Sequence, residues 1–202
     1  MPPAGRRPGP SRTREAVLEA ARAEFAARGF DAVTLRRVAA RAGVDPAMVT
    51  HHFGSKSGLF RAALDVSLDP ATELAAVLPG PLDELAGRLL GRLLVLWDSP
   101  AGAATIAAVR TALQDEDGTA LLRDLLLTQV LRPLAAALPG PEAERRWRVE
   151  LVASQVAGLL LIRYVLRLEP LASAGHPAVV AALGPTLQRY LTSPLPPASV
   201  EL

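Results

Sequence analysis

Cysteine is absent from this chain of 202 residues. Without thiols the protein forms no disulfide and offers no thiolate ligand to a metal ion. Structural disulfides are typical of secreted proteins, so a chain without cysteine fits a reducing compartment. We therefore expect a cytoplasmic protein whose fold is held by packing rather than by covalent cross-links.

Aromatic residues are scarce at 4%, whereas hydrophobic residues make up 50% of the chain. The core must therefore be built largely from leucine, alanine and valine. Leucine and alanine favour helix, and the sequence lacks alternating runs of β-branched and aromatic residues bounded by turns. The composition predicts an all-α protein.

Long apolar runs are missing as well. The longest, around residues 156–168, is interrupted by Arg163 and is too short to cross a bilayer. The first seven residues, MPPAGRR, lack the apolar core of a signal peptide. We expect no membrane partner.

Catalytic motifs are also lacking. The sequence contains no recognisable Ser/His/Asp set, no glycine loop for phosphates and no carboxylate pair at a meaningful site. The adjacent His51 and His52 make a poor metal site, because consecutive residues of a helix point apart. We therefore expect neither an enzyme nor a cofactor, and no bound metal.

Charge is distributed unevenly along the chain. Residues 1–56 hold ten Lys/Arg against five Asp/Glu, whereas the remainder holds twelve against fifteen. A basic N-terminal quarter favours phosphate binding at that end, unless the arginines merely reflect codon bias. Prolines and a lack of apolar periodicity predict a disordered basic arm at 1–10, where Arg6 and Arg7 either enter a minor groove or are simply solvated.

The most informative stretch is residues 33–53. Thr34 is a good N-cap for a helix, and Gly43 provides the backbone freedom that a helix end needs. Asp45 offers a second N-cap, with Pro46 at the first position of a short helix that runs to about residue 52. Two helices joined by a tight turn form a helix-turn-helix, whose second helix can lie in the major groove of DNA.

A set of marker residues extends this pattern over residues 13–64 in a single register. The markers are Phe25, Gly29, Phe30, Thr34, Ala39, the triplet Ala42-Gly43-Val44, the run Phe53-Gly54-Ser55-Lys56, Leu59 and Phe60. Together they resemble the DNA-binding domain of the tetracycline-repressor (TetR) family of bacterial transcription regulators. The resemblance implies an N-terminal three-helix DNA-binding domain, followed by a helical domain that binds a ligand and dimerises.

The helix signals complete the expected organisation. Ser11 or Thr13 should cap a helix that ends at Gly29, and Ser55 should cap a connecting helix at 56–68 that Asp69-Pro70 breaks. In order, we expect the basic arm at 1–10, the helix-turn-helix domain at 11–56 with the connecting helix 56–68, a helical effector-binding and dimerisation domain at 69–194, and a frayed tail at 195–202.

The second helix of the helix-turn-helix should present Ala47, Met48 and Thr50 to base edges. Alanine and threonine methyl groups can meet thymine methyl groups, and the hydroxyl can hydrogen-bond a base or a phosphate. Val49 and Phe53 should face the core.

Phosphate contacts are expected from Thr34, Arg36, His51, His52 and Lys56. In the TetR pattern the threonine both caps a helix and meets a phosphate at its N-terminus, although capping alone would explain it. The arginine could equally belong to a solvated face. Many family members carry an aromatic pair, commonly tyrosine, where this chain has threonine and histidine, so which of residues 50–52 reaches the backbone stays open.

Helical periodicity continues through the remaining residues, which should form five or six helices. Turn signals lie at Pro79-Gly80-Pro81, Ser99-Pro100, Asp115-Glu116-Asp117-Gly118 and Pro139-Gly140-Pro141. We expect helices over 81–97, 101–114, 119–138, 142–168 and 177–191, with a kink at Pro133.

The last two long helices are apolar over more of their circumference than one core needs. A two-fold, four-helix interface would bury them, and the TetR family dimerises in this way; a monomer with a thicker core is the alternative. The helix-turn-helix domains of the two chains could then read half-sites about 34–36 Å apart. The expected interface residues are Val152, Val156, Leu159, Val180, Leu183 and Leu187.

The resemblance also implies an effector pocket, in which apolar walls surround a few polar groups. A buried Arg163 must be paired, with Glu169, with a partner subunit or with an anionic ligand; a purely structural ion pair is the alternative to a ligand role. The candidate pocket residues are Trp97, Arg110, Gln114, Gln129, Trp147, Gln155, Arg163 and Tyr164.

These observations predict a sequence-specific DNA-binding transcription regulator. It would be a homodimeric repressor that leaves a palindromic operator in double-stranded DNA when a small-molecule effector binds. The alternative is a DNA-binding regulator without an effector, controlled by its abundance or by a protein partner.

Overall fold

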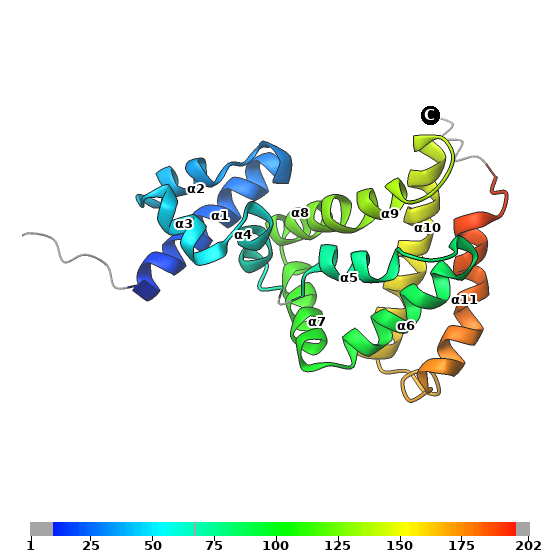
Figure 1. Ribbon diagram of the computed structural model, residues 1–202. Coiled ribbons are helices and arrows are strands. Elements are labelled where there is room, and N and C mark those ends of the chain that lie inside the picture. The colour runs from blue at the N-terminus through cyan, green and yellow to red at the C-terminus, as the bar shows by residue number, and fades with distance from the viewer. Residues whose placement is uncertain (1–9, 67, 197–202) are drawn as a thin grey trace, which may run out of the picture. The chain divides into compact units, whose positions relative to one another are not determined.

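The computed structural model describes residues 10–66 and 68–196. Over these residues the chain is helical and forms no strand, which confirms the predicted all-α class. Figure 1 shows the helices along the chain. Their bounds are α1 (Pro10–Ala32), α2 (Leu35–Ala42), α3 (Pro46–Phe53), α4 (Lys56–Ala63), α5 (Pro70–Val77), the 3₁₀ turn η1 (Leu82–Glu84), α6 (Leu85–Trp97), α7 (Pro100–Ala112), α8 (Glu116–Leu125), the π-helical η2 (Leu126–Leu131), α9 (Arg132–Ala136), α10 (Glu142–Leu160), the π-helical η3 (Leu161–Val165) and α11 (His176–Thr192).

The chain divides into two compact units. The N-terminal unit comprises the described part of Met1–Ser67 together with Ala108–Leu125, and the body unit comprises Leu68–Ala107 with the described part of Leu126–Leu202. Helices α1 to α4 and α8 therefore group together, whereas the expected division placed residues 108–125 with the rest of 69–194. The sequence alone did not indicate that α8 returns to the N-terminal unit.

Local capping positions the two helices of the helix-turn-helix. Thr34 Oγ1 accepts a hydrogen bond from Arg37 N–H at 3.2 Å, and Gly43 ends α2 in the left-handed region with φ 68°. Asp45 Oδ1 accepts one from a first-turn amide of α3 at 2.7 Å, and Pro46 opens that helix. The predicted helix-turn-helix is therefore confirmed. The residues expected to begin and end its two helices do so in the structure.

A compact apolar core joins the helices of the N-terminal unit. The Phe60 ring centroid lies 4.6 Å from that of Phe25 and 5.1 Å from that of Phe30. Helix α8 packs against α1 and contributes further leucines to this unit. The buried residues include Val17, Ala21, Phe25, Val38, Ala39, Val49, Leu59, Phe60, Leu121, Leu122 and Leu125.

Helix α1 differs from the prediction at both ends. It begins at Pro10, so Thr13 is buried inside the helix instead of capping it. Gly29 interrupts the helix where the sequence predicted, with φ 74° and ψ 166°, but the chain stays helical to Ala32 beyond the break. Glycine suits this position because other residues rarely adopt such a positive φ.

The helix predicted over 56–68 begins at Lys56 with Ser55 as its N-cap, as expected, but it is shorter than predicted. Helix α4 ends at Ala63, and Asp65 has a positive φ of 57°, which leaves helical geometry. Asp69 then starts a new helix, because its Oδ1 accepts a hydrogen bond from Ala71 N–H at 3.2 Å. Asp69-Pro70 thus opens α5 rather than breaking a longer helix.

Two further boundaries differ from the sequence-based expectation. The expected polar turn 115–118 is largely the first turn of α8, in which Asp115 Oδ1 accepts from Gly118 N–H at 2.7 Å. The long helix expected to reach residue 168 ends earlier, because η3 closes at Val165 and Arg167 has φ 52°. A third difference lies near Pro133, where the sequence predicted a kink. The chain there widens into the π-helical η2 just before α9.

The core of the body unit lies between α6, α10 and α11, and α11 packs along both of the others (Figure 1). Its apolar contacts come from leucine and valine, as the composition predicted. Fully or nearly buried members are Leu85, Leu90, Leu94, Val149, Val152, Leu159, Val179, Leu187 and Leu191.

Two expectations concern the chain ends and lie mostly outside the described residues: the basic arm at 1–10 and the tail at 195–202. Over residues 10–66 and 68–196, no helix is both long and apolar enough to cross a membrane. The same part of the chain brings no three His, Asp or Glu side chains together as a metal site.

Candidate nucleic-acid interface

Helix α3 turns one face into the protein and the other to solvent. Val49 is fully buried, whereas Phe53 is only half-buried and so meets the core prediction in part. Ala47, Met48 and Thr50 are exposed, with 38% of the Met48 surface accessible. The three predicted base-contact residues therefore lie on the open surface of a short helix.

The last turn of α3 carries the predicted phosphate donors His51 and His52, which are both exposed. Their ring centroids are 5.5 Å apart in an edge-on arrangement. Thr50 Oγ1 donates to the Pro46 carbonyl oxygen at 3.3 Å, so its hydroxyl proton is used inside the helix. The ring N–H groups of the two exposed histidines are also able to donate hydrogen bonds.

The N-terminus of α2 forms a second exposed edge, where Thr34 and Arg36 lie. Free N–H groups and the helix dipole make such a terminus attractive to anions. Thr34 is the confirmed N-cap of α2, and its side chain stays at the surface. A cap and a phosphate contact are compatible here because the hydroxyl group can both accept and donate.

Lys56 is held by its own domain. Its Nζ donates to the Asp31 carbonyl oxygen at 3.1 Å and lies 4.5 Å from the centroid of the Phe30 ring. These contacts tie α4 to the end of α1. The sequence did not predict this structural role. A phosphate contact from Lys56 would be made in addition to it.

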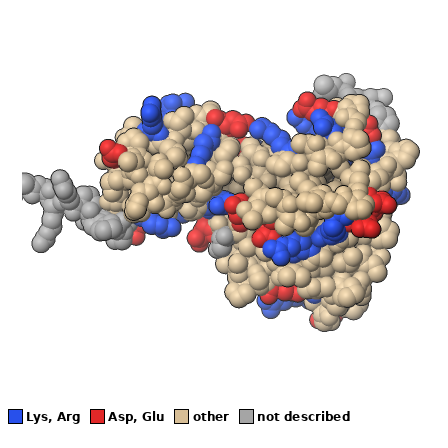
Figure 2. Space-filling model, in the orientation of Figure 1, with Lys and Arg blue, Asp and Glu red and all other residues tan. Residues whose placement is uncertain are grey.

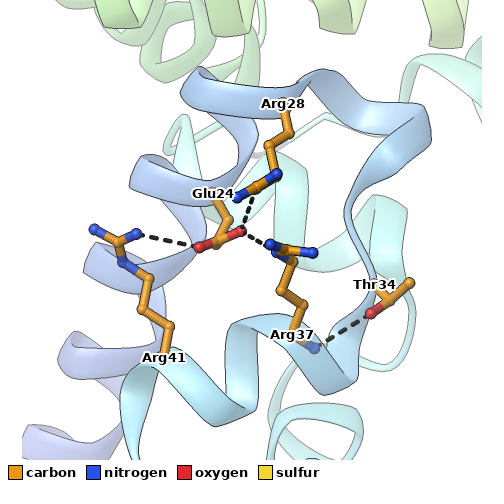
Figure 3. Close-up of polar contacts among 5 residues, drawn as sticks. All are labelled: Glu24, Arg28, Thr34, Arg37 and Arg41. Atoms are coloured by element: carbon orange, nitrogen blue, oxygen red, sulfur yellow. Dashed lines mark hydrogen bonds and ion pairs between the residues drawn. The ribbon is translucent and has the colours of Figure 1, made fainter.

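A buried carboxylate organises α1 and α2, as Figure 3 shows. Glu24 is 7% exposed and accepts hydrogen bonds from Arg28 Nε at 3.2 Å, Arg37 Nε at 2.7 Å and Arg41 Nη1 at 3.1 Å. Burial raises the pKa of the Glu24 carboxyl, but the bonds from Arg41 and Arg37 and the nearby guanidinium charges outweigh it and lower that pKa below its ordinary value. Three shared cations leave this cluster with net positive charge.

Figure 2 shows several basic side chains, together with a few acidic ones, on the visible face of the N-terminal unit. The exposed arginines of α1 and α2 are Arg14, Arg22, Arg28, Arg36, Arg37 and Arg41. A basic surface beside an outward-facing helix α3 is the electrostatic pattern of a DNA-binding domain.

The structure corrects half of the predicted dimer interface. Val152, Leu159 and Leu187 are at most 4% exposed and belong to the core of the body unit itself. The other three residues, Val156, Val180 and Leu183, are partly buried against the same core. Apolar periodicity identified buried faces correctly, but it did not distinguish a face covered by other helices of the same chain from one available to a second chain.

Arg163 has a structural role in the body unit. It is 8% exposed, and its Nη1 donates to the carbonyl oxygens of Leu171 at 2.6 Å and Ala174 at 2.8 Å. The suggested partner Glu169 instead accepts from the Ser173 hydroxyl at 2.6 Å. The guanidinium therefore holds the loop that precedes α11.

Around Arg163 lies a polar cluster that the sequence did not reveal. His176 Nε2 lies 2.5 Å from Asp98 Oδ2, and Arg163 Nη2 lies 4.0 Å from the same oxygen. Burial raises the pKa of Asp98, but the hydrogen bond to His176, the nearby Tyr164 hydroxyl and the charges of His176 and Arg163 lower it overall. Burial also raises the pKa of Tyr164. Its ring packs edge-on against that of Trp97, with 5.6 Å between the ring centroids.

The structure does not bring the eight predicted effector residues around one cavity. Trp97, Arg163 and Tyr164 cluster as described, but Arg110 and Gln114 are exposed and belong to the N-terminal unit. Gln129 and Gln155 are half-buried. Spacing along helices did not determine which polar residues converge.

Two hollows open at the surface of the body unit. One, of about 330 Å³, lies beside η3 and α11 and is lined by apolar residues with Glu169 at its edge. The other, of about 300 Å³, is lined by Trp147, Arg189, Tyr190 and the segment after α11. Trp147 alone among the predicted effector residues borders either hollow.

Comparison with known families agrees with this architecture. A family model described as bacterial regulatory proteins of the tetR family matches residues 17–63, and one described as a tetracyclin repressor-like C-terminal domain matches residues 83–191. The first match covers the helix-turn-helix together with its supporting helix, and the second covers more than half of the chain.

Individual relatives give the same picture. The chain is 40% identical over 53 residues to the HTH-type transcriptional repressor AcnR of Corynebacterium glutamicum, covering 26% of this chain and 28% of AcnR. It is 49% identical over 55 residues to the HTH-type transcriptional regulatory protein RaaS of Mycobacterium tuberculosis, covering 27% and 24%. The matches thus span about a quarter of these curated relatives. A solved TetR-family regulator from Streptomyces coelicolor A3 is 35% identical, with 93% of this chain and 99% of that chain covered and a TM-score of 0.45.

Proposed function

The chain belongs to the TetR family of bacterial regulatory proteins, and from this premise we propose that it is a homodimeric repressor that binds a palindromic DNA operator and is released by a small-molecule effector. The observation that carries the DNA-binding part is the outward presentation of α3. Val49 anchors the helix, while Ala47, Met48 and Thr50 stay exposed beside a basic surface. Base-edge contacts from α3 and phosphate contacts around it follow from this arrangement.

Phosphate contacts would surround the recognition helix. We assign them to Thr34 and Arg36 at the start of α2, to His51 and His52 at the end of α3, and to Lys56 at the start of α4. All five lie in the N-terminal unit, and four of them are exposed, whereas Lys56 is half-buried. Backbone contacts of this kind fix the register of the protein on the duplex without reading its sequence.

Dimerisation is supported by a surface of exposed small and apolar residues on α10 and α11 and just after α10. Ala157, Gly158 and Leu161 are exposed near the end of α10, and Ala178 and Ala182 are exposed on α11. Small residues let helices from two chains approach closely, and the exposed leucine would gain burial. We therefore assign the proposed interface to this surface instead of to the buried residues. Helices α10 and α11 of two chains would still form a two-fold, four-helix arrangement.

Effector binding is supported by unsatisfied polar atoms in the body unit. Within the described residues, Arg163 Nε and the Tyr164 hydroxyl are buried without a hydrogen bond of regular geometry, although the hydroxyl lies close enough to Asp98 to lower the pKa of that carboxyl. The Tyr164 ring packs against the Trp97 ring. Buried polar atoms that lack partners often mark functional sites. A ligand that offers a hydrogen-bond acceptor next to an aromatic face would satisfy them.

An effector-free regulator is the second candidate, and one observation favours it. Trp97 and Tyr164 pack against each other, and most of the predicted pocket residues do not converge. A thermal-shift screen of small molecules separates the two candidates. A compound that stabilises the wild-type protein and releases DNA, but does neither with Tyr164→Phe, would support the effector site; a protein that binds DNA and responds to no compound would favour the alternative.

Selection of bound duplexes from random DNA tests the core of this proposal. The dimer should enrich a palindrome whose half-sites are separated by about one helical turn or a multiple of it. Enrichment of no sequence, with affinity governed by salt alone, would overturn sequence-specific binding.

A further inference from the structure

A short backbone joint connects α1 to α2 in the N-terminal unit. This α1–α2 joint is residues 29–34: Gly29 breaks α1, Val33 N–H donates to the Phe30 carbonyl oxygen at 3.4 Å, and Thr34 caps α2. Whatever fixes the joint also fixes the N-terminus of α2, where two of the proposed phosphate contacts lie.

Side chains from two other helices hold the joint by its backbone. Phe30 N–H donates a hydrogen bond to Asp124 Oδ2 of α8, and the Asp31 carbonyl oxygen accepts one from Lys56 Nζ of α4 at 3.1 Å. A carboxylate is a strong acceptor for a backbone N–H, because its charge shortens and strengthens the bond. Asp124 is therefore well suited to restrain Phe30 even though it lies far away in the sequence.

Packing keeps Asp124 in place. Leu121, Leu122 and Leu125 of the same helix are buried, and α8 packs against α1 within the N-terminal unit. The next element along the chain, η2, already belongs to the body unit. The carboxylate that restrains the joint is thus carried by the last turn of the helix that leads into the body.

We propose that Asp124 is a positioning residue for DNA binding: its carboxylate, through Phe30 N–H, sets the position of the N-terminus of α2 and hence of the phosphate contacts made there. The proposal rests on the DNA-binding function proposed above. Asp124 itself touches no DNA in this scheme. Its effect on affinity passes through the backbone of the joint.

The sign of the effect separates positioning from simple electrostatics. Removing a carboxylate from a DNA-binding unit makes that unit more positive, and charge alone would then strengthen binding to phosphates. Loss of positioning predicts the opposite, a weaker complex. Because Asp124 neutralises no phosphate, the dependence of affinity on salt concentration should keep its slope.

The experiment compares full-length Asp124→Ala and Asp124→Asn with the wild type, and uses Asp117→Ala as the matched control. Asp117 is an exposed carboxylate on the same helix. On the DNA selected by the wild type, we expect Asp124→Ala to lose about 5- to 30-fold in affinity with an unchanged salt slope. Asp124→Asn keeps an oxygen acceptor and should recover most of the loss, whereas Asp117→Ala should bind at least as tightly as the wild type.

Hydrogen exchange of the DNA-free proteins provides the second readout. The amides of residues 30–37 should exchange faster in Asp124→Ala than in the wild type, while the amides of α3 keep their protection. Wild-type affinity or tighter binding by Asp124→Ala, or unchanged exchange in the joint, would overturn the inference alone. If the wild-type protein itself enriched no DNA sequence, the proposed function would fail, and the DNA-positioning role of Asp124 would fail with it.

Discussion

Lys56 combines a structural role with a proposed phosphate contact. Its ammonium group contacts the Asp31 carbonyl oxygen and the Phe30 ring, and it lies one residue after the N-cap of α4, Ser55. A DNA phosphate would compete for the same three N–H donors. The two roles make different predictions for substitutions that keep or remove the hydrogen bond.

We predict that Lys56→Ala lowers the unfolding free energy by about 1–2 kcal/mol, because it removes a hydrogen bond and a cation–π contact. Lys56→Gln keeps a donor and should lose less stability. Both variants should reduce the salt slope of DNA affinity by about one unit, since each removes one phosphate neutralisation. Urea unfolding and binding titrations at several salt concentrations measure these effects; an unchanged slope in both variants would rule out the phosphate contact.

Glu24 gives the N-terminal unit a defined response to acid. Its folded-state pKa is lowered because hydrogen bonds from Arg41 and Arg37 outweigh the effect of burial. The resulting stabilisation is therefore complete above the ordinary glutamate pKa and is lost as the pH falls through the lowered folded-state pKa.

We predict that the stability difference between the wild type and Glu24→Gln is largest near neutral pH and shrinks as the pH falls from about 6 to about 3. Urea unfolding across this range measures it, and Glu73→Gln in the body unit, where Glu73 pairs with Arg92 at 2.6 Å, controls for losing a carboxylate elsewhere. A difference that stays constant with pH would show that Glu24 acts through its shape and not through its charge.

At the scale of elements, the contact between α3 and α4 depends on one glycine. A Cβ atom on Gly58 would overlap the carbonyl oxygen of Phe53, which belongs to backbone that cannot simply rotate away. Gly87 in α6 is the matched opposite, because a Cβ there would meet nothing within 4 Å.

Gly58→Ala should therefore destabilise the protein by about 1–3 kcal/mol through overpacking. Gly87→Ala should stabilise it by about 0.5–1 kcal/mol, because alanine is the better helix former. Thermal and urea unfolding of both variants test this pair. Equal effects from the two substitutions would mean that helix propensity, and not the α3–α4 contact, governs the result.

The helix-turn-helix could be predicted from the sequence because its signals are local. Thr34, Gly43, Asp45 and Pro46 each act on backbone groups a few residues away, and the structure confirms all four. The short α4 could not be predicted, since the periodic residues after Lys56 continue past Ala63 although the helix does not. A helix that ends at a positive φ on a non-glycine residue leaves no compositional signal.

Contacts between distant residues set the limit on site prediction. Glu24 reads as one polar position in an amphipathic helix, and only the fold brings Arg37 and Arg41 to its carboxylate. Asp124 likewise reads as a surface residue of α8, yet it binds Phe30 N–H. The exposed residues of α3 could be predicted because the helix is short and its ends are marked by capping residues. Once its single buried valine faces the core, most of its other side chains must lie at the surface.

For the whole molecule, the proposed dimer follows from the exposed apolar residues near the end of α10. Leu161 is 46% exposed, whereas the residues first predicted for the interface are partly or wholly in the core. Leu161→Glu leaves the core of one chain intact but places a charge in the proposed interface.

We predict that Leu161→Glu raises the dimer dissociation constant at least about 10-fold, because an unpaired charge would be buried. Val95→Glu, at a residue that is 55% exposed on α6, is the control and should leave dimerisation unchanged. Sedimentation equilibrium measures both. Equal dimerisation of Leu161→Glu and the wild type would place the interface elsewhere on the protein.

The central claim is that exposed side chains of α3 read base edges, and selection from random DNA with Met48→Ala tests it most directly. Compared with the wild type, Met48→Ala should relax base preference at one position of each half-site by about fivefold or more, with the salt slope unchanged. Arg36→Ala, the control, should weaken binding to all sequences alike and lower the slope. A Met48→Ala protein that selects the same palindrome with the same discrimination would contradict the account.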